Sequence, residues 1–170
     1  MLNEADRILL MPHIMVDGDG LGSAAALCMA LRHLDKTAWI VLEDQVADHL
    51  MFLQRDLCVQ VEQCPVRQPD VTLCIDCGDE GRFPRRKDLF RKGNITVCID
   101  HHPTSTGIAD LNFIDPEAAA TGELIYDLIR ENDWPLDQAE AESLFAAIAT
   151  DTGNSPTRSE ERRVGKECRS

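Results

Sequence analysis

The chain has 170 residues, of which 44% are hydrophobic and 28% are charged, a composition typical of one globular domain with its own core. Its 30 acidic and 17 basic side chains give a net charge of −13. Such a surface repels polyphosphate and argues against binding of long duplex nucleic acid, although a small anionic substrate held by metal ions remains compatible with it. No run of about 18 apolar residues and no secretion leader is visible. We therefore expect a cytoplasmic protein with no membrane partner.

Apolar and β-branched runs alternate with stretches of helical periodicity along the chain. Strands are predicted at 7–11, 38–42, 58–61, 71–75, 95–99 and 112–115, and helices at 21–34, 46–54, 84–91, 118–132 and 136–149. Strands that alternate with helices predict an α/β fold with a mostly parallel sheet and helices on both of its faces. The seven cysteines lie mostly within these apolar patterns, so we expect them to be reduced and buried.

The last segment, residues 158–170, differs from the rest in composition and shows no hydrophobic period. It is similar to the translation of a common sequencing adapter, and we interpret it as a non-native tail that takes no part in the fold. Residues 1–157 are then the native part, and we expect them to be the N-terminal piece of a longer protein.

Potential metal ligands follow three of the predicted strands and the last predicted helix. They are His13, Asp17 and Asp19 after the first strand, Asp76 after the fourth, Asp100, His101 and His102 after the fifth, and Asp151 after the helix. The carboxyl ends of parallel strands meet at one edge of a sheet, so the first three places converge there, and Asp151 can fold back onto them. Carboxylates and imidazoles suit Mn, Mg, Fe or Zn, and a set of this size meets the needs of two divalent cations.

Three glycines, at 18, 20 and 22, surround the second aspartate of the Asp17-x-Asp19 pair. Glycine permits backbone conformations that other residues avoid. We therefore expect these glycines to form a tight turn that points the two aspartates toward different ions.

Two further features each have a structural and a functional interpretation. Cys74-x-x-Cys77 has the spacing of a redox or zinc pair, but the chain has no second cysteine pair with zinc spacing, which favours packing in the core. A basic cluster is either a solvated helix face or a patch that steers an anionic substrate toward the neighbouring Asp76. Its members are Arg82, Arg85, Arg86, Lys87, Arg91 and Lys92.

Taken in order, four motifs resemble those of the DHH phosphoesterase family. They are His-x-x-x-Asp-x-Asp-Gly-Leu-Gly-Ser from His13, Cys-Ile-Asp-Cys-Gly-Asp from Cys74, Ile-Asp-His-His-Pro from Ile99, and Ala-Thr-Asp-Thr-Gly from Ala149. The resemblance covers about residues 7 to 156. Within the family, the motif that begins at Asp17 and the Thr-Gly-Glu-Leu-Ile-Tyr segment from Thr121 are similar to the nanoRNase/pAp phosphatase branch.

The resemblance implies two divalent cations, most commonly Mn²⁺, with Mg²⁺ or Co²⁺ as alternatives. His13 and Asp17 would bind the first ion and Asp76 would bridge to the second. The second ion would be completed by Asp19, His101 and Asp151. His102 would face the scissile phosphate as leaving-group acid or phosphate ligand, and Asp100 would orient a histidine. Weaker expectations place Ser23, Arg82 and Thr121 in contact with substrate, Thr121 having a helix-capping role as its alternative.

The implied activity is hydrolysis of short oligonucleotides to nucleoside 5'-monophosphates, or of 3'-phosphoadenosine 5'-phosphate to AMP. Alternatives within the superfamily are a cyclic dinucleotide phosphodiesterase and an inorganic pyrophosphatase. Pyrophosphatases usually carry Asn-Pro where this chain has Met15-Val16, which argues against that activity. Members of this branch also have a second, smaller substrate-binding domain, which is missing here. A metal-binding but inactive fragment is therefore another alternative, and the full-length protein is expected to be able to form a homodimer.

Overall fold

Six parallel strands form a single sheet in the order β3-β2-β1-β4-β5-β6. The computed structural model describes residues 1–153, and the predicted tail at 158–170 lies outside this part. The strands are β1 (Arg7–Pro12), β2 (Thr37–Leu42), β3 (Cys58–Gln60), β4 (Val71–Ile75), β5 (Ile95–Asp100) and β6 (Leu111–Ile114). The chain winds outward from β1 on one side and from β4 on the other, so the strand order reverses between these two neighbours. At such a switch point the connections diverge and leave a crevice at the carboxyl edge of the sheet.

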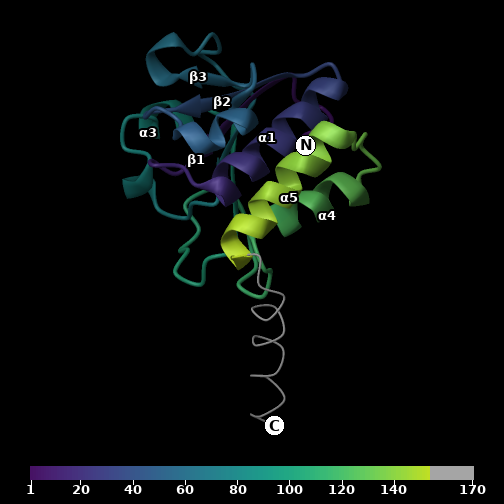
Figure 1. The fold of residues 1–170 in the computed structure, drawn as a ribbon. Helices are drawn as coiled ribbons and strands as arrows, with labels where there is room; N and C mark the ends of the chain where they lie inside the picture. Colours follow the sequence, from purple (N-terminus) through teal and green to yellow (C-terminus); the bar gives the residue numbers. More distant parts are fainter. Residues whose placement is uncertain (154–170) are drawn as a thin grey trace.

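Three long helices, α1 (Gly18–His33), α4 (Thr121–Glu131) and α5 (Gln138–Thr152), lie on one face of the sheet (Figure 1). Of these, α1 and α4 contact the strands, and α5 packs on these two helices. The other face is covered by the single-turn helix α3 (Lys87–Phe90) and by irregular segments. The predicted α/β fold with a mostly parallel sheet is confirmed, although the two faces are covered unequally.

The sequence of β1 shows why the sheet is buried on both faces. Ile8 and Leu10 belong to the larger hydrophobic cluster, on the side of the long helices, whereas Leu9 and Met11 belong to the smaller one with Phe83. Successive side chains of a strand point to opposite faces, so a continuous apolar run suits a strand covered on both sides.

The helix predicted at 46–54 is a 3-10 helix, Asp48–Leu50, followed by the single turn α2 (Met51–Gln54). Arg55, directly after α2, has a φ of 43°, which no α-helix can continue. Two other 3-10 helices, Val61–Gln63 and Glu80–Arg82, lie between strands.

The basic helix predicted at 84–91 is reduced to the single turn α3, and a buried carboxylate holds the residues just before it. Glu43, just after β2, accepts hydrogen bonds from the backbone N–H groups of Arg85 and Arg86. The Arg86 guanidinium is itself buried and pairs with Glu43 at 2.9 Å. The start of this segment is thus tied to the end of β2.

The glycines near the start of α1 do not form the predicted turn. They lie within α1, and none of the three has a positive φ. A Cβ atom at Gly18 would approach the Thr150 side chain to 2.3 Å, and one at Gly22 would approach the Ser143 carbonyl oxygen to 2.5 Å. Glycine is needed at these two positions because α5 packs directly on the backbone of α1.

Candidate metal centre

The carboxyl edge of the sheet brings together the predicted ligands from β1, β4 and β5. His13 directly follows β1, and Asp76 directly follows β4. Asp100 is the last residue of β5, and the two histidines come next. These places flank or adjoin the point where the strand order reverses, which is where open α/β sheets bind ligands.

Two helix ends complete the centre. Asp17 is the N-cap of α1 and accepts a hydrogen bond from the Gly20 N–H at 3.0 Å, while Asp19 lies in the first turn. Asp151 lies in the last turn of α5, so that helix runs further than predicted and delivers this carboxylate itself.

The first group of potential ligands consists of His13, Asp17 and Asp76. Nε2 of His13 lies 3.4 Å from Oδ1 of Asp17 and 3.6 Å from Oδ2 of Asp76. Nδ1 of His13 is 2.7 Å from the Ile14 carbonyl oxygen. A carbonyl can only accept a hydrogen bond, so Nδ1 carries the proton and the lone pair of Nε2 is available to a cation.

The second group surrounds the buried imidazole of His101, which is 4% exposed. Its Nε2 atom lies 3.6 Å from Asp19, 3.8 Å from Asp76 and 3.8 Å from Asp151. This nitrogen has no hydrogen-bond partner within the described part of the chain. A buried nitrogen that faces three carboxylates at these distances fits a cation held between them.

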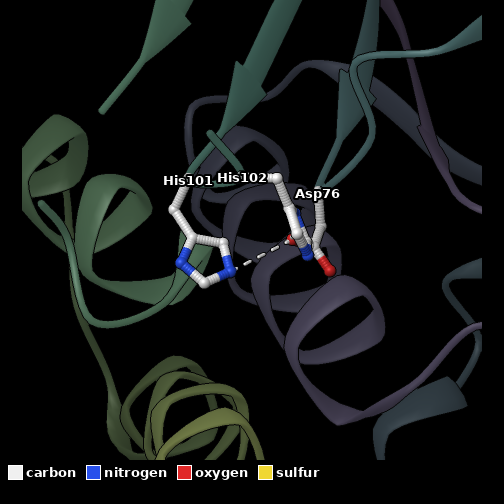
Figure 2. A group of neighbouring side chains, drawn as sticks. All are labelled: Asp76, His101 and His102. Atoms are coloured by element: carbon white, nitrogen blue, oxygen red, sulfur yellow. Dashed lines mark ion pairs between the residues drawn. The ribbon is translucent and has the colours of Figure 1, made fainter. Parts of the chain in front are cut away.

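Asp76 belongs to both groups and also lies near His102 (Figure 2). One of its oxygens faces His13, and the other faces His101 and His102. Its backbone has a φ of 56°, a left-handed conformation that is uncommon outside glycine and occurs often at functional sites. A carboxylate placed in this way can be shared by two cations.

Asp19 is held by the N-terminus of α4. Its two oxygens accept hydrogen bonds from the backbone N–H groups of Thr121 at 2.7 Å and Gly122 at 2.9 Å, and from the Ser23 hydroxyl at 3.0 Å. Unpaired N–H groups and the helix dipole make a helix N-terminus favourable for a carboxylate. The sequence offers no signal for these backbone donors.

Ser23 and Thr121, which are predicted to contact substrate, are both fully buried. The Ser23 hydroxyl donates to Asp19, and the Thr121 hydroxyl donates to Asp76 at 2.8 Å. The N-cap of α4 is Ala120, so the side chain of Thr121 is not a cap either. Both hydroxyls fix the positions of potential metal ligands.

His102 is the more accessible imidazole of the two, with 40% of its side chain exposed. Its Nδ1 atom lies 2.8 Å from Oδ1 of Asp100, which also accepts the backbone N–H of His102 at 3.1 Å. Asp100 therefore orients His102 and leaves its Nε2 atom available to a ligand.

The residues of the first group shift one another's pKa values. Burial alone would lower the pKa of His13, but hydrogen bonds with Asp17 and Asp76 raise it to about 9. Burial alone would raise the pKa of Asp17, but the hydrogen bond with His13 lowers it to about 2. Without a cation, the imidazole and the carboxylate thus stabilise each other as an ion pair.

The pKa of Asp19 is shifted in the opposite direction from that of Asp17. Burial and the negative charge of Asp76 raise its pKa to about 7, against the hydrogen bonds that favour its charged form. Two buried carboxylates repel each other unless a positive charge lies between them. The donor set and its electrostatics therefore both fit a divalent cation.

Most of the basic cluster is used within the fold. Arg85 pairs with Glu62, Arg86 pairs with Glu43, and Lys87 and Arg91 both pair with Glu80. Arg82 is exposed, and its charge acts on Asp17, where it adds to the lowering of the pKa after burial and the hydrogen bonds with His13 and Gly20. Within the basic cluster, Arg82 is therefore the member whose charge acts on a potential metal ligand.

Cys74 and Cys77 are buried in the smaller hydrophobic cluster, which confirms the prediction of core packing. Both thiols are free, and burial raises the pKa of Cys77 to about 11. The Cys74 thiol is directed at a backbone oxygen, that of Val97, at 3.4 Å. These contacts explain the pair without a metal.

A parallel α/β domain that gathers two groups of imidazoles and carboxylates at its switch point defines the class of this protein. The family described as "DHH family, N-terminal domain" matches residues 7–148, and the chain therefore belongs to the DHH family.

Named relatives match the chain over part of their own length. The bifunctional oligoribonuclease and PAP phosphatase NrnA of Bacillus subtilis is 28% identical over 151 residues, which cover 87% of this chain and 47% of the relative. The protein of the same name from Thermus thermophilus is 30% identical over 148 residues, covering 86% and 44%. The cyclic-di-AMP phosphodiesterase GdpP of Geobacillus thermodenitrificans is 27% identical over 169 residues, covering 89% and 26%. The chain thus spans at most about half the length of these relatives.

Solved structures have the same fold. An exopolyphosphatase-related protein from Bacteroides fragilis superimposes with a TM-score of 0.84 at 23% identity, covering 96% of this chain and 51% of its own. Exonuclease RecJ bound to manganese gives a TM-score of 0.53 at 22% identity, covering 88% and 41%. Among the described residues of this chain, no helix has the length and apolar character needed to cross a membrane.

Proposed function

We propose that the chain is the catalytic half of a metal-dependent phosphoesterase that hydrolyses short oligoribonucleotides to nucleoside 5'-monophosphates and 3'-phosphoadenosine 5'-phosphate to AMP. The observation that supports this most is the position of Asp76, which faces both groups of potential ligands. The names of the NrnA relatives support the substrate class.

Two divalent cations would occupy the centre. His13, Asp17 and Asp76 would hold one, and Asp19, Asp76, His101 and Asp151 would hold the other. Mixed carboxylate and imidazole ligands suit Mn²⁺, with Mg²⁺ and Co²⁺ as alternatives. When bound, such ions neutralise charge that develops on a phosphoryl group and lower the pKa of water.

His102 is the residue of the chain placed to move a proton. Its Nδ1 atom is held by Asp100, so Nε2 can face the leaving oxygen of a phosphate ester. Burial alone would lower the pKa of His102, but the hydrogen bond with Asp100 and the charge of Asp76 raise it above its ordinary value. The protonated form that a general acid requires is thereby favoured.

Charge also restricts the substrate. The acidic chain, with a net charge of −13, repels a long polyanion, whereas a substrate with few phosphates can be held locally. Arg82 is exposed near the centre and would attract the phosphate groups of such a substrate.

The proposal is tested by hydrolysis of a diribonucleotide and of 3'-phosphoadenosine 5'-phosphate in the presence of Mn²⁺. His102→Asn is the matched control, because it removes the proposed acid without removing a proposed metal ligand. We expect turnover of both substrates by the unmodified chain and loss of turnover in the variant. Metal binding without hydrolysis by the unmodified chain would instead support the alternative of a metal-binding but inactive fragment.

Cyclic-di-AMP is the second candidate substrate, because the GdpP relative aligns with 89% of this chain. The same assay with cyclic-di-AMP distinguishes between the cyclic and the linear dinucleotide as substrate. Faster hydrolysis of the cyclic than of the linear dinucleotide would favour this alternative.

A further inference from the structure

A second cluster of potential ligands lies at the other end of the helix pair that carries the metal centre. His33 is the last residue of α1, Asp137 is the N-cap of α5, and Glu140 lies in the first turn of α5. The start of α1 and the end of α5 both lie at the metal centre, so the two neighbouring helices run antiparallel (Figure 1). With a rise of 1.5 Å per residue, the length of α1 places this cluster roughly 20 Å from the centre.

The three residues bring potential ligand atoms close together. One ligand atom from each lies within 4.8 Å of the others. Nδ1 of His33 is 3.2 Å from Oε1 of Glu140, and its Nε2 atom is 3.8 Å from Oδ2 of Asp137. An ion would use one of these two ring nitrogens, and small side-chain rotations would bring the three ligand atoms to the distance of about 2.0–2.2 Å that zinc requires.

Glu140 provides an independent indication of a ligand. Its side chain is only 1% exposed, although it carries a carboxylate. Oε2 accepts the backbone N–H of Asp137 at 3.2 Å as part of a capping box, but Oε1 accepts no hydrogen bond within residues 1–153. A capping box needs only one of the two oxygens. The second oxygen is buried, directed toward His33 and without a hydrogen bond, which is costly unless a positive charge lies close to it.

The charges of the cluster fit a divalent cation. Two carboxylates and one neutral imidazole carry a formal charge of −2, which one divalent cation would neutralise. Imidazole and carboxylate groups are both zinc ligands, and three protein ligands leave a fourth position for water. Asp137 is largely exposed, so a metal has a path to the cluster from solvent.

We propose that His33, Asp137 and Glu140 bind a zinc ion that joins the end of α1 to the start of α5, separately from the metal centre. The ion ties together the two helices that bring Asp17, Asp19 and Asp151 to that centre. Binding of this ion to the folded chain stabilises it by mass action.

The test counts zinc ions bound per chain after equilibrium dialysis, by mass spectrometry of the metal. Two variants remove a ligand with little change in shape: His33→Gln, and Glu140→Gln, whose amide oxygen can still accept the capping hydrogen bond. His49→Gln, an exposed histidine in the 3-10 helix Asp48–Leu50, is the matched control. We expect the two cluster variants to bind one zinc ion fewer than the unmodified chain and than His49→Gln.

A second readout separates this site from the metal centre. In an Asp76→Asn background, which removes the ligand shared by both groups of the centre, zinc should still raise the unfolding temperature. The rise should be lost when His33→Gln is added. Equal zinc content in the cluster variants and the unmodified chain would overturn the proposal, whatever the outcome of the hydrolysis assays.

Discussion

The hydroxyl of Thr121 donates a hydrogen bond of 2.8 Å to Oδ1 of Asp76, a residue 45 positions earlier in the chain. The backbone N–H of the same threonine donates to Asp19 at 2.7 Å. The start of α4 therefore holds two of the three carboxylates around His101 in fixed positions. This relationship makes α4 part of the metal centre although it supplies none of the predicted ligands.

Thr121→Val should weaken metal binding because valine has the shape of threonine without the hydroxyl. Loss of such a supporting hydrogen bond typically reduces metal affinity by about 10–100-fold. Titration calorimetry with Mn²⁺ measures the change. Thr121→Ser keeps the hydroxyl and should retain most of the affinity; an equal loss in both variants would show that the methyl group, and not the hydrogen bond, is what matters.

Gly22→Ala should destabilise the fold. The added Cβ would lie 2.5 Å from the Ser143 carbonyl oxygen and 3.1 Å from the Ala147 backbone nitrogen, so α5 must move away from α1. Overpacking of this kind costs about 1–3 kcal/mol in the free energy of unfolding, measured by urea denaturation. Gly81→Ala is the control, because its nearest contact is the Asp79 carboxylate at 3.2 Å, a side chain that can move aside. A smaller effect at Gly22 than at Gly81 would contradict the proposed close packing.

Asp70→Asn should reduce stability in a pH-dependent manner. The hydrogen bonds and charge of Arg7 lower the pKa of Asp70 from 3.8 to about 2. A carboxyl group whose pKa is lower in the folded chain stabilises it fully above pH 4, and this contribution is lost as the pH falls toward 2. Because the pair is partly exposed and screened by solvent, we expect a difference of about 1 kcal/mol or less.

The measurement for Asp70 is the free energy of unfolding of both chains at pH 7, 5 and 3 in the presence of a chelator. The difference between them should shrink at the lowest pH. Asp56→Asn serves as control, because Asp56 is 89% exposed and its ion pair with Arg32 is expected to contribute little at any pH. A difference for Asp70→Asn that grows as the pH falls would have the wrong sign.

His102→Asn should abolish most turnover while leaving both metals bound. Loss of a general acid typically reduces kcat by about 10²–10⁴-fold. Asp100→Asn should also reduce kcat, because an amide at this position disturbs the orientation and protonation of His102. Metal content and kcat measured on the same samples test this, and loss of metal from His102→Asn would show that His102 is a ligand instead.

Sequence patterns predicted the elements that have their own strong signal. The apolar runs of β1, β4 and β5 and the polar residues after them placed His13, Asp76 and His101 at one edge of a parallel sheet. These predictions worked because strand periodicity and the topology of parallel sheets leave few alternatives.

What the sequence did not reveal depends on contacts between distant segments. The N–H groups at the start of α4 that hold Asp19 are backbone groups and carry no residue signature. The sequence has glycine at 18 and 22, but it does not show whether the backbone conformation or a neighbouring helix requires glycine there. The different burial of the adjacent His101 and His102 likewise depends on distant segments, because His101 lies against the Ala118 carbonyl oxygen and the Asp151 carboxylate.

The central claim is that Asp76 is shared by two metal ions, and the number of Mn²⁺ ions bound by two variants tests it most directly. Titration calorimetry should find two ions in the unmodified chain, none in Asp76→Asn, and one in Asp19→Asn, because Asp19 belongs to only one of the groups. Retention of two ions by Asp76→Asn would contradict the account, since it would mean that neither ion depends on the carboxylate that faces both groups.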